Sequence, residues 1–148
     1  MIIKQVGLQD LDKTAILFDQ YRVFYSQPSN IEAGKIFLEE RIAKSESVIF
    51  LALSEDEKPM GFVQLYPIFT SVGIQRKWLL NDLFVNDSFR KLGVGRALMN
   101  RAKDYAIETN TAGLVLETAI DNLKAQQLYE SLGYERDQQH FHYDLDLR

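Results

Sequence analysis

Arg90-Lys91-Leu92-Gly93-Val94-Gly95-Arg96 connects an apolar run at 78–85 to a helical pattern at 94–105. The first amide groups of a helix have no acceptor within it, and the helix macrodipole places partial positive charge at that end. Two glycines without a Cβ let the backbone turn sharply and approach a ligand, and three cationic side chains add charge. The stretch therefore predicts an anion site that suits phosphate, against the alternative of two glycines that only turn the chain.

Length and composition indicate one domain. The chain has 148 residues, of which 46% are hydrophobic, so we expect residues 1–148 to form a single domain with its own core. Cysteine is absent, which excludes disulfides, thiolate metal sites and a cysteine nucleophile. His140 and His142 are the only histidines, and they do not make a zinc site by themselves, so we expect no metal.

Charge and hydropathy narrow the range of partners. The formal net charge is -4, whereas general nucleic-acid binding needs a broad basic surface, so we expect no nucleic-acid partner. No apolar run approaches the length that spans a bilayer, and the segment Met1 to Gln5 lacks the pattern of a leader. We therefore expect a cytoplasmic protein with no membrane partner.

Hydrophobic periodicity along the chain alternates between the spacing of strands and that of helices. This order predicts an α/β (α+β) domain with one mixed, mostly antiparallel sheet of six to seven strands, about four helices, and a parallel central pair joined by a crossover helix. The second helix should begin after Ser29, an N-cap residue type with Glu32 at capping-box spacing. Expected strands are 1–6, 47–53, 60–66, 78–85, 114–118 and a final pair around Tyr134 and at 141–147. Expected helices are 10–25, 30–44, 94–105 and 123–132.

A second informative segment runs from Glu117 to Tyr134. Either Asp121 or Asn122 can cap the helix that follows it. One face of that helix combines a polar, a small, an apolar and a phenolic side chain at helical spacing. Such a stripe is either a buried face of the helix or the support of a functional tyrosine. The stripe consists of Asn122, Ala125, Leu128 and Tyr129.

The two segments occur in a typical order and spacing. The chain has Arg-x-x-Gly-x-Gly from Arg90 to Gly95, followed by Asn-x-x-Ala-x-x-Leu-Tyr-x-x-x-Gly-Tyr from Asn122 to Tyr134. This pattern resembles the GNAT superfamily of N-acetyltransferases, and the resemblance covers essentially the whole chain. Asn86-Asp87 is a departure, because the family often has proline there; the anion site is unaffected. Three further segments, 21–25, 61–66 and 80–85, look like the histone and polyamine acetyltransferase-like branch.

The resemblance implies a GNAT fold and a cofactor site for acetyl-CoA. The pyrophosphate would bind the amides of the glycine turn, and the pantetheine arm would run beside the preceding strand. In the family the two central parallel strands splay apart there, which frees backbone groups for the arm and one amide for the thioester oxygen. That amide would stabilise the oxyanion, a contribution of about 3 kcal/mol in well-studied cases. The implied cofactor-binding residues are Leu83, Phe84, Val85, Arg90, Lys91, Leu92, Gly93, Val94, Gly95, Arg96, Asn122 and Tyr129.

The resemblance also implies acetyl transfer to an amine by direct attack through a tetrahedral intermediate. An ammonium group must lose a proton before it attacks, and the departing thiolate must gain one. Glu117 is the first candidate for the base, because it resembles the proton acceptor of the ribosomal-protein acetylases in the superfamily. Asp82, next to the cofactor strand residues, is the second candidate, and either could act through water. Tyr129 matches the general acid of the family.

The acceptor is left open among a small amine, a polyamine and a protein lysine or N-terminus. Tyr21 and Tyr25 are the expected substrate-binding residues, since aromatic rings with nearby carboxylates attract a cation, although ordinary core packing also explains them. An alternative function is a non-catalytic acyl-CoA-binding sensor or interaction module. A phosphotransferase is excluded, because no Gly-Lys-Ser/Thr follows the glycines. Alternating apolar residues at 141–147 allow a homodimer through C-terminal strands, as in relatives.

Overall fold

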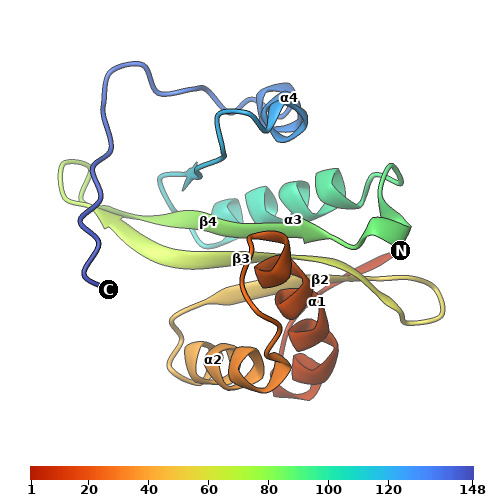
Figure 1. The fold of residues 1–148 in the computed structure, drawn as a ribbon. Coiled ribbons are helices and arrows are strands. Elements are labelled where there is room, and N and C mark those ends of the chain that lie inside the picture. The colour runs from red at the N-terminus through yellow and green to blue at the C-terminus, as the bar shows by residue number, and fades with distance from the viewer. The chain divides into compact units, whose positions relative to one another are not determined.

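The computed structural model describes residues 1–148, which divide into two compact units, 1–116 and 117–148. The second unit contains one regular element, the helix α4 (Leu123–Ser131). The first unit contains all five strands of the molecule (Figure 1). Its elements are β1 (Ile2–Gln5), η1 (Leu8–Asp10), α1 (Leu11–Phe24), α2 (Ile31–Ala43), β2 (Val48–Leu53), β3 (Pro59–Thr70), β4 (Gln75–Val85), η2 (Asp87–Phe89), α3 (Val94–Glu108) and β5 (Leu114–Val115).

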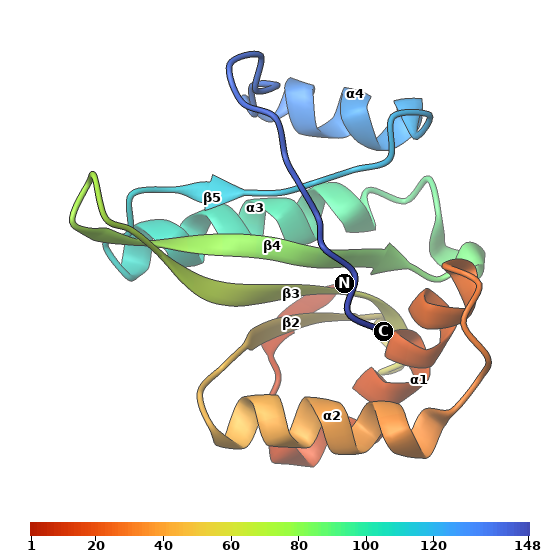
Figure 2. The same cartoon turned by 60° about the vertical axis from the view of Figure 1, so that its left-hand side comes forward.

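The sheet has the order β1-β2-β3-β4-β5. The first three neighbouring pairs are antiparallel, and β4 pairs with β5 in parallel across the crossover helix α3. Figure 2 shows α1 and α2 against one face of this sheet and α3 against the other. The predicted mixed α/β architecture with a parallel pair is therefore confirmed, with five strands in place of six to seven.

Both faces of the sheet are covered by apolar side chains. On the face of α1 and α2, Leu38 and Phe62 are completely buried at the centre of a cluster that also includes Phe18. On the face of α3, Leu98 is completely buried, and the Trp78 ring packs beside that of Tyr105. Because the sheet is sandwiched between helices, any polar side chain that points from its middle becomes buried.

The boundaries of β3 and α2 correct two predictions. β3 continues past Pro67 to Thr70, because β2 pairs with β3 only as far as Leu65, and a proline without an N–H is tolerated on the free edge beyond that point. The N-cap of α2 is Asn30, whose side chain accepts a hydrogen bond from the amide of Ala33. The predicted cap Ser29 instead donates its hydroxyl to Asp19 Oδ2 at 2.6 Å, and so ties the α1–α2 connection to α1.

The predicted final pair of strands is wrong. No residue beyond Val115 pairs in the sheet, and the segment 141–147 is not a strand. A strand needs a neighbour for its backbone hydrogen bonds, and alternation of apolar residues does not supply one. The four apolar side chains of this segment are 83–91% exposed. They are Phe141, Tyr143, Leu145 and Leu147.

A β-bulge changes the phase of β4 in its middle. Gln64 of β3 lies opposite Asp82, whereas the next residue, Leu65, lies opposite Leu80, so Asn81 is an extra residue without a partner. Opposed residues share a face of the sheet, and neighbours along β3 point to opposite faces. Leu80 and Asp82 therefore point to opposite faces, although they are two residues apart. The bulge turns Asp82 toward the α1 and α2 side.

Candidate functional site

The glycine turn leads into α3 as predicted, with the geometry of an anion site. Gly93 is the N-cap residue and has a left-handed φ of 79°, and Lys91 also has a positive φ of 64°. The backbone hydrogen bonds of the helix begin when the amide of Ala97 donates to the carbonyl of Gly93. The amides of Val94 and Gly95 precede that bond, and the first turn contains no acidic residue. An anion would therefore meet free N–H groups and the positive end of the helix dipole.

Arg90 fastens this turn to the end of β4. Its Nε donates to the carbonyl oxygen of Val85 at 3.1 Å, and its Nη1 lies 3.1 Å from Asp87 Oδ1. Its guanidinium also lies 5.9 Å from the ring centroid of Phe24. These contacts hold Arg90 in place and partly balance its charge. They give the residue a role in positioning the loop that its position in the sequence did not reveal.

The edge of β4 is open where the apolar arm of a ligand could follow it. Pairing with β5 is limited to Trp78 with Leu114 and Leu79 with Val115. From Leu80 to Val85, β4 continues without a strand on that side, while β3 still pairs with it on the other. Backbone groups of Leu80 to Phe84 that point away from β3 are thus available to a ligand, whereas the Val85 carbonyl already accepts from Arg90 Nε. The parallel pair is short, as expected for strands that separate.

Asp82 is the buried carboxylate of this stretch. It is 2% exposed, and it accepts hydrogen bonds from Asn81 Nδ2 at 2.7 Å and from Gln64 Nε2. Burial raises the pKa of the Asp82 carboxyl above its ordinary value, although hydrogen bonds from Asn81, Gln64 and the Tyr21 hydroxyl oppose the shift. The raised pKa makes Asp82 a stronger proton acceptor than an exposed carboxylate.

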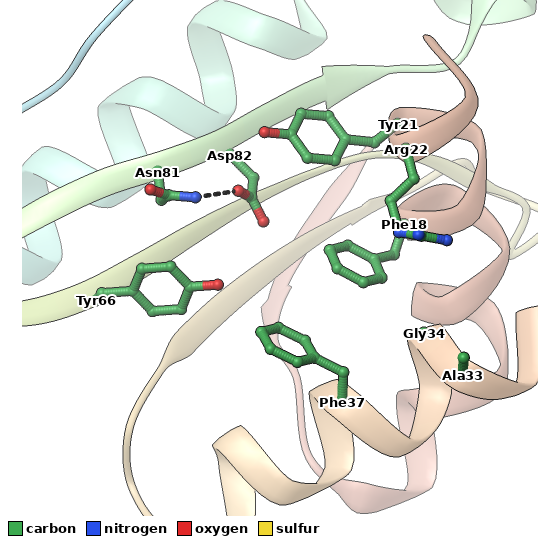
Figure 3. A pocket seen from close by; sticks show the side chains of 9 residues that line it. All are labelled: Phe18, Tyr21, Arg22, Ala33, Gly34, Phe37, Tyr66, Asn81 and Asp82. Carbon is green, nitrogen blue, oxygen red and sulfur yellow. Dashed lines mark hydrogen bonds between the residues drawn. The ribbon is translucent and has the colours of Figure 1, made fainter. Parts of the chain in front are cut away.

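A cavity of about 380 Å³ lies beside Asp82 on the α1 and α2 side of the sheet. Figure 3 shows Asp82 and Asn81 at its β4 wall, with aromatic side chains around the remaining space. Because every lining residue belongs to residues 1–116, the cavity is a property of the first unit alone. The lining residues are Phe18, Tyr21, Arg22, Ala33, Gly34, Phe37, Tyr66, Asn81 and Asp82.

Of the two predicted substrate-binding tyrosines, Tyr21 lines this cavity. Tyr25 does not line it; it is 54% exposed and packs edge-on against Tyr21, with the ring centroids 5.1 Å apart. Burial, with Asp82 and Tyr25 nearby, raises the pKa of the Tyr21 hydroxyl, so this group stays protonated and can donate.

Seven lining residues were not predicted as site residues from the sequence: Phe18, Phe37, Tyr66, Asn81, Arg22, Ala33 and Gly34. The first three occupy apolar positions of helices and a strand, which read as ordinary core residues. Tyr66 is two residues from Gln64 along β3, so the two side chains point to the same face of the sheet. This alternation was the one sequence signal that could have indicated Tyr66. Asn81 reaches the cavity only because of the bulge, which has no clear sequence signature here.

The remaining predicted site residues belong to the second unit. Asn122 is the N-cap of α4, and its Oδ1 accepts a hydrogen bond from the amide of Ala125 at 3.3 Å. The ring of Tyr129 lies 6.2 Å from that of Tyr134, measured between centroids. Burial, and Tyr129 nearby, raise the pKa of Tyr134 to about 12. Glu117 is exposed.

The structure contains no group of three or more side chains that could hold a metal ion. It also contains no helix that is both long enough and apolar enough to span a bilayer.

Residues 14–134, which include parts of both units, match the model of the acetyltransferase (GNAT) family. The chain belongs to the acetyltransferase (GNAT) family. The GNAT resemblance predicted from Arg90 to Gly95 and Asn122 to Tyr134 is thereby confirmed.

Full-length relatives agree with this assignment. The chain is 44% identical over 147 residues to the uncharacterized N-acetyltransferase YhfO of Bacillus subtilis, covering 99% of this chain and 98% of the relative. It is 35% identical over 131 residues to a probable acetyltransferase of Haemophilus influenzae, covering 88% of each. A crystal structure of a probable acetyltransferase superimposes with a TM-score of 0.94 at 42% identity, covering 100% of this chain and 99% of that one. This GNAT protein is therefore an N-acetyltransferase.

Two features of the chain fit acetyl-CoA. The free amides of Val94 and Gly95 suit its pyrophosphate, and the open edge of β4 suits its extended, amide-containing arm. A Cβ added to Gly93 would meet no atom within 4 Å, so there is open space beside the backbone of this turn. The residues predicted for the cofactor at 83–85 and 90–96 all belong to the first unit, at the end of β4 and around the start of α3.

Proposed function

We propose that this GNAT protein transfers the acetyl group of acetyl-CoA to a primary amine by direct attack. The observation that carries the proposal is the buried carboxylate of Asp82 in an aromatic cavity, within the same strand as the open edge at Leu83 to Val85. One end of this strand leads to an anion site, and its middle faces a cavity of small-molecule size. Acetyl-CoA supplies the activated acetyl thioester.

The cofactor would be held by two backbone features. The amides from Lys91 to Arg96 would bind the pyrophosphate, with Lys91 and Arg96 adding charge. The edge of β4 from Leu83 to Val85 would bind the arm, and one of its amides would stabilise the oxyanion of the tetrahedral intermediate, a term of about 3 kcal/mol. Asn122 is proposed as a further cofactor contact.

Asp82 is our candidate for the group that takes the proton from the acceptor ammonium. Its burial favours the neutral form of the carboxyl, so proton transfer from the ammonium to Asp82 relieves a buried charge. Glu117, the first candidate by resemblance, is exposed. Tyr129 is the proposed acid for the departing thiolate, on the family pattern.

The cavity supports a small amine as the acceptor. A volume of about 380 Å³ accommodates a compact molecule, and Tyr21 would contact it together with Asp82. Tyr25 would contribute by supporting the ring of Tyr21. We also propose that the two units work as a single acetyltransferase domain, since the family model covers parts of both.

A homodimer is proposed from the C-terminal segment 141–147. Its apolar side chains alternate along the chain and are 83–91% exposed. An exposed apolar face on an extended segment is usually covered by a partner. The partner that covers this segment would be a second copy of the same chain.

The test is release of CoA thiol in the presence of acetyl-CoA and a broad panel of primary amines. Asp82→Asn should lower kcat/KM by about 10²–10⁴ and remove the acidic limb of its pH profile, because the amide cannot accept the proton. Glu117→Gln, the matched change of an exposed carboxylate, should alter kcat/KM by less than about threefold. Tyr129→Phe should lower kcat with little change in CoA binding.

A non-catalytic acyl-CoA sensor would behave differently. It would bind CoA, yet no amine would release thiol, and Tyr129→Phe would have no effect. The reverse ranking of the two carboxylates, with Glu117→Gln inactive and Asp82→Asn near normal, would make Glu117 the base.

A further inference from the structure

The cavity beside Asp82 has a polar end built for one cation. Asp82 is the only carboxylate among its nine lining residues. Gln64, which is completely buried and does not line the cavity, donates its Nε2 to this carboxylate. A primary ammonium group offers three donors and one positive charge.

Four aromatic rings line the rest of the cavity. The rings of Phe18 and Phe37 are stacked with centroids 5.9 Å apart, and Tyr21 stacks on Phe18 at 6.2 Å. Tyr66 completes the ring-lined wall, and burial raises the pKa of its hydroxyl, so it remains neutral. Walls of this kind suit the body of an aromatic molecule, which gains both apolar burial and ring contacts.

The same walls disfavour a second positive charge. The only other charged residue that lines the cavity is Arg22, a cation for which the structure has no ion-pair partner. A polyamine with one ammonium at Asp82 would place its next ammonium among phenyl rings and toward Arg22, without a carboxylate to pair with. Cation–π attraction offsets only part of the cost of removing that charge from water.

We infer that the acceptor is a small primary monoamine with a flat, apolar body, of the arylalkylamine type, and that polyamines are poor acceptors. The inference rests on the proposed acetyl transfer and names the acceptor class of that site. Asp82 receives the ammonium group, the four rings contact the body, and Arg22 repels a second cation.

The experiment compares phenethylamine, spermidine and a short lysine-containing peptide as acceptors with acetyl-CoA. Thiol release gives kcat/KM for each, and mass spectrometry of the amine confirms acetylation. We expect phenethylamine to exceed spermidine and the peptide by about tenfold or more. A second arm titrates the same amines into the protein without acetyl-CoA and follows its thermal unfolding. Phenethylamine should raise Tm, and spermidine should not.

Charge reversal at the cavity sharpens the test. Arg22→Glu adds the missing second carboxylate and should shift the spermidine-to-phenethylamine ratio by about fivefold or more toward spermidine. Lys103→Glu makes the same charge change at an exposed position of α3, on the other face of the sheet, and should leave that ratio unchanged.

The outcomes separate the two proposals. Preference for spermidine or for the peptide overturns the acceptor class and leaves acetyl transfer standing. If no amine is acetylated, the proposed function fails, and the binding arm decides the class on its own. Equal Tm shifts for phenethylamine and spermidine would then overturn the inference.

Discussion

Replacing Gly61 by alanine would push β3 and β4 apart at the end of β4 that the cofactor is proposed to follow. A Cβ at Gly61 would lie 2.7 Å from the carbonyl oxygen of Phe84, 3.3 Å from Val85 Cα and 3.3 Å from Leu98 Cδ1. Ordinary van der Waals contact begins at 3.4 Å, so the backbone of one strand must move. Rotation of a side chain cannot relieve the clash, because the atom nearest to the added Cβ, the carbonyl oxygen of Phe84, belongs to the main chain.

Two effects of this substitution oppose each other. Overpacking of a buried site costs about 1–3 kcal/mol, whereas the loss of glycine flexibility in the unfolded chain returns about 0.4–1 kcal/mol. The cost of the clash with Phe84 is therefore the larger effect, and the free energy of unfolding should fall by about 1–2 kcal/mol. For a chain of 148 residues this corresponds to a fall in Tm of about 2–8 °C.

Circular dichroism during heating measures the change, with Gly73→Ala as the matched control. Gly73 lies in an exposed turn, and the atom nearest its added Cβ is Thr70 Cγ2 at 3.1 Å, the end of a side chain that can move. That variant should unfold within about 2 °C of the parent. If Gly61→Ala unfolds at the parental temperature, the tight contact between β3 and Phe84 is not rigid, and the reasoning is refuted.

Three further predictions follow from other parts of the chain. Gly93→Ala should lower Tm, because a left-handed φ of 79° costs an alanine about 1–2 kcal/mol, while Gly93→Asn should lower it less; equal effects in a melting experiment would contradict the conformational argument. Asp10 is buried, and although burial raises its pKa, hydrogen bonds from Lys4 and from the Gly7 amide lower it further, so that it lies below its ordinary value. The stability that comes from this lowered pKa is fully present above the unfolded-state pKa of about 3.9, and it is lost as the pH falls through the folded-state pKa. In urea unfolding, Asp10→Asn should therefore lower the free energy of unfolding by about 1–2 kcal/mol at pH 7 and by much less at pH 3. Replacing both Tyr143 and Leu145 by lysine should yield monomers in light scattering, whereas Asp144→Lys, on the other side of the segment, should not; a monomeric parent protein would refute the proposed dimer.

The sequence predicted the parts of the fold that depend on local signals. The glycine turn and the start of α3 at Val94 lie where the pattern placed them, because a helix start, a left-handed glycine and a preceding strand are all encoded within a few residues. The parallel pairing of β4 with β5 also followed from the crossover helix between them. Asn122 was one of two expected caps of α4, and it is the residue that caps.

Predictions that depend on distant partners were less successful. The segment 141–147 alternates like a strand, but the sheet offers it no neighbour. Ser29 resembles a cap, but the buried Asp19 on α1 takes its hydroxyl, and Asn30 takes the cap position. In each case the local pattern was present, and a partner outside the segment, absent for 141–147 and present for Ser29, decided the outcome.

The candidate site was predicted by type more than by shape. Asp82 was predicted as a candidate base and Tyr21 as an aromatic substrate-binding residue, and the structure brings the two together beside one cavity. The aromatic walls contributed by Phe37 and Tyr66 were not foreseen, because a ring that lines a cavity and a ring that fills a core have the same sequence pattern. Their roles depend on how closely α2 approaches the sheet.

The bulge at Asn81 divides β4 into two parts that have different roles. Residues before it, Trp78 and Leu80, are buried on the α3 side and hold the sheet to that helix. After it, Asp82 lines the cavity, and Leu83 to Val85 form the part of the strand without a β5 neighbour. Because one unpaired residue divides the halves, acceptor preference can diverge among related enzymes through changes on one side without disturbing the side that maintains the fold. Deleting Asn81 would make the ladder regular and leave Asp82 opposite Gln64, so the cavity would keep its carboxylate and lose only the amide that donates to it.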